Sequence, residues 1–170
     1  MVALVALAVA ATGCARQERS QLPVECRAGR PALRAALERA PDPVRVDGVP
    51  ISKCFVRSGD ASDIAAVGSD YLAVASDLAL RARRQPASAD SVRLGYLVGS
   101  MRRGALRTQG IHDEMIRRIE QELVLVDTGS EAYRRGRAQV GPRGERLPDE
   151  HAQAAASISP APCVRLACRA

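Results

Sequence analysis

Hydrophobic and polar positions between residues 62 and 82 repeat with a period of seven. The segment reads SDIAAVG, SDYLAVA and SDLALRA, so Ser-Asp opens each of three consecutive units. Seven residues are nearly two turns of an α-helix, which places Asp63, Asp70 and Asp77 in one stripe and the apolar residue after each Asp in a neighbouring stripe. The pattern predicts an amphipathic helix that begins near Ser62. Neighbouring aspartates lie about 10 Å apart along its axis, so no single metal ion can bridge them and we expect a solvated or arginine-paired flank.

A second helical pattern extends from residue 90 to residue 126. Its apolar positions keep a 3.6-residue step throughout: Leu94, Leu97, Val98, Met101, Ala105, Ile111, Met115, Ile116, Ile119, Leu123 and Val126. A break in the helix normally resets this phase, so we predict one long helix over 90–126, with a kink allowed at Gly110. The short connection around Ala87 makes the two helices an antiparallel hairpin. We expect Gly95 and Gly99 to pack against Tyr71 or Leu72.

Shorter elements precede this hairpin. Pro31 suits a first helical turn, and the apolar positions that follow it recur at helical spacing until Pro41, which predicts a short first helix. Asp47-Gly48 stands between two alternating apolar stretches and is typical of a β-hairpin turn. Pro50 confines the second strand to a sheet edge.

The start of the chain carries a targeting pattern. An uncharged apolar run from Val2 to Ala11 ends in Ala11-Thr12-Gly13-Cys14. Such a run is too short to span a bilayer, which needs about 20 residues, and fits the apolar region of a cleaved signal. Residues 11–14 resemble the lipobox of bacterial lipoproteins, in which small residues precede an acylated cysteine. The resemblance covers only the first fourteen residues.

This resemblance implies a location. Residues 1–13 would be a signal peptide, Cys14 would carry the lipid, and residues 14–25 would form a polar tether. The protein would then lie in the cell envelope, attached through its lipid anchor to the outer face of the cytoplasmic membrane. Soluble secretion, after cleavage near Gly13, is the alternative.

Four further cysteines follow: Cys26, Cys54, Cys163 and Cys168. An even number in an exported chain indicates two disulfides, with three connectivities that the sequence alone leaves open. We favour Cys26–Cys54 and Cys163–Cys168, while pairings that tie the tail to the body use the same residues. A zinc site is disfavoured because the chain has C-x4-C rather than the usual C-x2-C pairs.

The formal net charge is +6, and the predicted signal contains no charged residue. Outside the cytoplasm, a basic surface favours anionic lipid or wall polymer. With three tyrosines, one phenylalanine and no tryptophan, the chain has few aromatic rings for stacking, so nucleic acid is not a predicted partner. Arginine pairs recur at 83/84, 102/103, 117/118 and 134/135. Since glutamates are interleaved with some of them, we favour solvated faces with i,i+4 ion pairs over a binding surface.

His112 is the main candidate for chemistry. It falls on the apolar stripe, and the hairpin geometry places it opposite Asp60 and Asp63. An imidazole beside carboxylates can carry protons or bind metal, but a core histidine hydrogen-bonded to an aspartate is the favoured interpretation. The chain contains no H-E-x-x-H, G-x-S-x-G, G-x-G-x-x-G or phosphate-binding loop. We therefore predict no catalytic constellation, cofactor or metal.

Together these patterns predict a mainly α fold, an antiparallel helical hairpin or small bundle with a short N-terminal helix, a β-hairpin and a stabilising disulfide. The folded domain is expected over 26–137, followed by a Pro/Gly/Ala-rich tail over 138–170 with a terminal cysteine pair. The predicted function is a lipid-anchored interaction or structural module of the envelope, with another envelope protein or wall polymer as partner. Two alternatives are a small-ligand carrier, with its pocket between the long helix and the hairpin, and an enzyme using His112 with Asp60 or Asp63.

Overall fold

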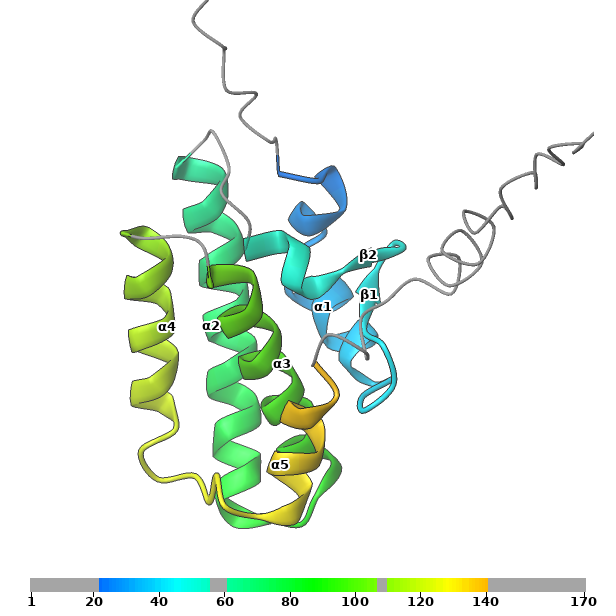
Figure 1. The fold of residues 1–170 in the computed structure, drawn as a ribbon, viewed down its shortest axis with the longest axis vertical. Coiled ribbons are helices and arrows are strands. Elements are labelled where there is room, and N and C mark those ends of the chain that lie inside the picture. Colours follow the sequence, from blue (N-terminus) through cyan, green and yellow to red (C-terminus); the bar gives the residue numbers. More distant parts are fainter. Residues whose placement is uncertain (1–21, 56–60, 107–109, 141–170) are drawn as a thin grey trace, which may run out of the picture.

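The structure is a computed structural model that describes residues 22–55, 61–106 and 110–140. These ranges contain five α-helices and one two-stranded antiparallel sheet, so the expectation of a mainly α fold is confirmed (Figure 1). None of the helices in these ranges combines the length and apolar character needed to cross a membrane. The buried core includes Leu22 and Val140, so the packed region extends slightly beyond the predicted 26–137.

The centre of the fold is the predicted antiparallel hairpin, formed by α2 (Ala61–Arg84) and α3 (Ala89–Ala105) (Figure 1). The apolar residues of the seven-residue repeat, Ile64, Tyr71 and Leu78, are all buried. The repeat therefore forms the inner face of α2, and its period explains why one face of this long helix stays covered.

The predicted single helix over 90–126 is wrong. α3 ends at Ala105, and a separate helix α4 (Ile111–Glu122) begins after Gly110, whose φ is +73°. α4 runs back along the bundle beside α2 (Figure 1). Both α3 and α4 direct apolar residues toward α2, so the hydrophobic phase continues although the helix does not. Gly68 of α2 makes room for Met115, whose sulfur would lie 1.7 Å from a Cβ at that position.

A further short helix, α5 (Glu131–Ala138), packs against α3. The Ser130 hydroxyl caps it by accepting a hydrogen bond from the Tyr133 amide at 3.3 Å. Gly95 and Gly99 face this helix rather than Tyr71 or Leu72, so that expectation is wrong. A Cβ at Gly95 would lie 2.1 Å from the Tyr133 carbonyl oxygen, which shows that the two helix backbones touch.

The N-terminal elements cover the other side of the hairpin. They are the 3-10 helix η1 (Val24–Arg27), helix α1 (Gly29–Leu37), strands β1 (Arg45–Val46) and β2 (Val49–Pro50), and the 3-10 helix η2 (Ile51–Phe55). The predicted β-hairpin is present, with Val46 opposite Val49. Both turn residues, Asp47 and Gly48, have positive φ, as tight hairpin turns of this kind require.

Candidate functional site

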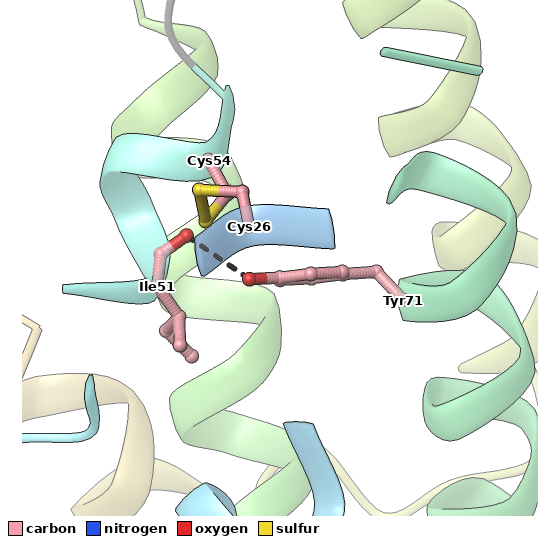
Figure 2. Close-up of a disulfide and its surroundings, with 4 residues drawn as sticks. All are labelled: Cys26, Ile51, Cys54 and Tyr71. Carbon is pink, nitrogen blue, oxygen red and sulfur yellow. Dashed lines mark hydrogen bonds between the residues drawn. A yellow bond between two sulfur atoms is a disulfide. The ribbon is translucent and has the colours of Figure 1, made fainter. Parts of the chain in front are cut away.

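A buried disulfide fastens the start of the domain to its core. Cys26 of η1 is bonded to Cys54 of η2, as predicted, and both residues are buried. Figure 2 shows the Tyr71 ring reaching from α2 toward this bond, where its hydroxyl donates to the Ile51 carbonyl at 3.4 Å. Phe55 packs edge-on against the same ring, with centroids 4.6 Å apart. Cys14, Cys163 and Cys168 lie outside the described residues.

The aspartate stripe of α2 is paired with arginines. Of the two expected arrangements, a solvated flank and an arginine-paired flank, the structure has the second. Asp63 pairs with Arg27, Asp70 with Arg30 at 3.3 Å, and Asp77 with Arg34. The pairs follow chain order, so η1 and α1 run in the same direction as α2 along this side. Exposed ion pairs contribute about 0–1 kcal/mol each, so their main consequence is to set the register of α1 on α2. The stripe is structural rather than a site.

His112 is buried, but its predicted partner Asp63 does not bond to it. No hydrogen bond joins its ring to a described residue, and its Nε2 is buried without a partner. Asp63 is engaged by Arg27 instead. Asp60 lies outside the described residues. The expected hydrogen bond between His112 and Asp63 is therefore absent, because Arg27 of η1 pairs with that carboxylate and α4 approaches α2 through Met115.

The region of the predicted pocket that includes Gly104 and the segment after the β-hairpin is closely packed. Gly104 of α3 lies against η2 so closely that a Cβ there would stand 2.3 Å from the Ser52 carbonyl oxygen and 2.6 Å from the Phe55 Cβ. Backbone packed at this separation leaves no space for a ligand. No cleft opens where Gly104 of α3 meets η2.

A groove of about 330 Å³ lies elsewhere, between α1, α2 and α3. Its floor is apolar and its rim carries charges of both signs. Its lining residues are Arg34, Leu37, Glu38, Val74, Leu78, Arg81, Asp90 and Arg93. This volume lies at the lower end of the range for small-molecule sites.

The rim charges of the groove are mutually neutralised. Asp90 accepts hydrogen bonds from Arg81 Nε at 2.9 Å and from Arg93 at 3.0 Å, and Arg93 also binds Glu38. The Arg93 Nε is buried without a partner. Glu38 is the weakest member of this network because its side chain is 63% exposed. A ligand that enters the groove would therefore meet paired guanidinium groups, with Glu38 the group most easily displaced.

The arginine pairs of the sequence divide into two groups. Arg117 and Arg118 pair with Glu114 on their own helix, at i,i+3 and i,i+4 spacing as expected, and Arg102 pairs with Glu120 across the bundle. The arginines of α5 differ, since none of them has a carboxylate partner in the described parts of the chain. Tyr133 anchors α5 from beneath. Burial raises the pKa of its phenol above the ordinary 10.0, while the nearby Arg102 and Arg137 guanidinium groups lower it.

Comparisons with protein-family models, with curated proteins and with solved structures gave no match for this chain. Across residues 22–55, 61–106 and 110–140, no cluster of three or more His, Cys, Asp or Glu side chains is arranged to hold a metal ion.

Sequence reasoning did not anticipate the groove, because its lining comes from three helices whose packing the sequence leaves open. Arg34, Arg81 and Arg93 come from three different helices, α1, α2 and α3, and no sequence motif links them. Helix α5 had one available signal, the Ser130-Glu131 start, which is typical of a capped helix.

Proposed function

We propose that this protein is an exported helical module of the bacterial cell envelope, held through a lipid on Cys14 and acting by binding rather than by catalysis. The observation that carries the proposal is the buried Cys26–Cys54 disulfide. Structural disulfides form and persist in oxidising compartments outside the cytoplasm, which is where the lipobox-like residues 11–14 would direct the chain.

The position of the disulfide also suits an anchored protein. Leu22 is buried, and Cys26 follows four residues later, so the tether enters the core directly at its attachment point. The disulfide joins this entry to η2, which packs against α3. A force applied to the tether is then transmitted through the Cys26–Cys54 bond to η2 in the core, so it does not detach η1 from the domain.

The test is the chemistry of the native N-terminus. We expect mass spectrometry of protein purified from its own cells to find Cys14 as the first residue, modified by diacylglycerol on sulfur. Cys14→Ala should move the protein from the membrane fraction to the soluble fraction. The matched control, Cys26→Ala with Cys54→Ala, removes the disulfide but should stay in the membrane fraction. An unmodified Cys14, or a Cys14→Ala protein that stays equally membrane-bound, refutes the anchor.

The groove between α1, α2 and α3 favours a second candidate function, a small-ligand carrier. Its apolar floor, formed by Leu37, Val74 and Leu78, suits a molecule with an apolar body. Native mass spectrometry of the gently purified protein should then detect a bound small molecule. Leu78→Phe fills the floor and should abolish it, whereas Leu80→Phe, at an exposed position of the same helix, should not. Protein without any bound molecule contradicts this function.

A further inference from the structure

Unpaired positive charge gathers on α5. Arg134, Arg135 and Arg137 are exposed, and none forms a hydrogen bond or ion pair in the described parts of the chain. Glu131 stands three and four residues before Arg134 and Arg135, at the spacing that favours ion pairs, yet no such pair forms. We call these three residues the α5 arginine surface.

The rest of the described surface contrasts with this patch. Eight arginines on η1, α1, α2, α3 and α4 are bound to carboxylates: Arg27, Arg30, Arg34, Arg81, Arg93, Arg102, Arg117 and Arg118. Other exposed cations without a carboxylate partner, such as Arg39, Lys53 and Arg84, lie on separate segments. Only on α5 do three such arginines share one short helix.

The helix that carries this surface is firmly mounted. A Cβ at Gly136 would lie 1.9 Å from the Val92 carbonyl oxygen, so α5 and α3 are in backbone contact. Ala132 and Tyr133 are buried beneath the helix, and Arg103 of α3 donates to the Val140 carbonyl at 2.9 Å, just after the helix ends. The outward arginines are therefore attached to a backbone that does not need to be ordered on binding.

We propose that the α5 arginine surface binds the phosphate groups of anionic lipids and so orients the domain on the membrane. The proposal rests on the envelope location proposed above. Guanidinium groups bind phosphate oxygens in a bidentate manner and are more weakly hydrated than ammonium groups, which favours contact with a headgroup layer. The aromatic ring of α5, Tyr133, is buried, so this helix offers no platform for stacking bases or sugars.

The expected strength follows from the number of arginines. A basic residue near an anionic membrane surface strengthens binding about fivefold, so three together strengthen it on the order of 100-fold. The attraction is screened beyond about 10 Å at 0.1 M salt, so it acts only when the domain already lies close to the membrane. A lipid on Cys14 would keep it there, and the arginines would select which face turns toward the lipid.

The test separates this surface from the lipid anchor. The chain from residue 14 to residue 170, carrying Cys14→Ser, keeps every described contact because the packed residues lie between 22 and 140. It should sediment with vesicles of phosphatidylglycerol mixed with phosphatidylcholine, and not with phosphatidylcholine alone. The Cys14→Ser chain carries no lipid, so its binding to vesicles and the acylation of Cys14 in cells are independent results. Vesicle binding can fail while Cys14 is acylated, and acylation can be absent while the vesicles are bound.

Two variants with equal loss of charge decide the location of binding. Arg134→Gln, Arg135→Gln and Arg137→Gln together should weaken binding to the anionic vesicles on the order of 100-fold, with an unchanged circular dichroism spectrum. The control Arg84→Gln, Arg117→Gln and Arg118→Gln should weaken it only a few-fold. Equal loss in both variants means that binding follows net charge and overturns the proposal.

Competitors decide the nature of the ligand. Sodium phosphate should release the protein from the vesicles no better than sodium chloride of equal ionic strength. Soluble polyphosphate should bind more weakly than the vesicles do. Specific release by phosphate would assign the surface to free anions, and tighter binding to polyphosphate through the same three arginines would assign it to a polymer. Either result overturns the lipid assignment. Failure of the wild-type protein to bind anionic vesicles overturns it as well.

Discussion

The close contact between α3 and α5 predicts how Gly136→Ala changes the stability of the fold. Two effects of opposite sign contribute, a gain in helix propensity and a steric overlap. In an exposed helix, replacing glycine by alanine stabilises the fold by about 1 kcal/mol. At Gly136 the new Cβ would lie 1.9 Å from the Val92 carbonyl oxygen and 2.8 Å from its carbon. Since these atoms are backbone, neither partner can rotate away, and α5 must move outward by roughly 1 Å to restore ordinary packing. Gly136→Ala should therefore destabilise the protein.

The size of the effect follows from what the movement disturbs. Overpacking a close interface costs about 1–3 kcal/mol, and the displaced helix also loosens the buried Tyr133 ring. After subtracting the gain in helix propensity, we expect a net loss of about 1–2 kcal/mol. Gly95→Ala, with a contact of 2.1 Å to the Tyr133 carbonyl oxygen, should behave alike. Gly99→Ala should cost least, because its nearest contact is a Val140 methyl group at 3.1 Å.

Urea unfolding followed by far-ultraviolet circular dichroism, with the disulfide kept oxidised, measures these differences. Ala138→Gly is the control on the same helix, where the side chain is exposed and the loss should be the propensity alone, at most about 1 kcal/mol. If Gly136→Ala is as stable as its parent or more stable, the backbone contact between α3 and α5 does not exist, and the firm mounting of the α5 arginine surface is refuted with it.

Three other predictions concern the core. Cys26→Ala with Cys54→Ala opens a loop of sequence separation 28 and should cost about 3–4 kcal/mol in urea unfolding; a loss below about 1 kcal/mol would contradict a covalent role for this pair. Burial raises the pKa of Tyr133, so the folded state holds the phenol proton more tightly; stability should be full below about pH 10 and fall as the pH rises through the folded pKa. Tyr133→Phe should reduce that alkaline fall in the urea midpoint, and an unchanged slope would count against it. His112→Ala should lower the thermal midpoint by leaving a cavity, whereas His112→Leu should keep or raise it, because the buried Nε2 has no partner to lose. A His112→Ala protein that is fully stable but inactive in cells would instead support the enzyme hypothesis.

The elements that the sequence predicted well are those with a repeated local signal. Three units of seven residues define the inner face of α2, and the Asp47-Gly48 pair defines the hairpin turn. The sequence predicted that arginines could pair with the aspartate stripe, but not which arginines. Arg27 and Asp63 are 36 positions apart, so the pairing depends on how η1 and α1 dock, which no local pattern encodes.

The sequence patterns did not predict α4 and α5 as separate helices, for a related reason. α4 continues the apolar phase of α3 because both face α2, so periodicity alone cannot detect the reversal after Gly110. Eight residues are too few for α5 to show a sustained stripe, and two of the positions that hold it in place are glycines on the two facing helices, Gly95 and Gly136. A glycine carries no hydrophobic signal, and its meaning appears only when the facing backbone is known.

The same limit applies to charge, and there it bears on function. Read along the sequence, the arginine pairs 117/118 and 134/135 look equivalent, since each has a glutamate three or four residues before it. In the fold, Glu114 binds both Arg117 and Arg118, whereas Glu131 binds neither Arg134 nor Arg135. Guanidinium groups already bound to carboxylates gain little from an external anion, because the new contact replaces an existing one. The arginines available to an external partner are therefore the ones that the fold leaves unpaired, and in the described parts of the chain three of them lie together on α5.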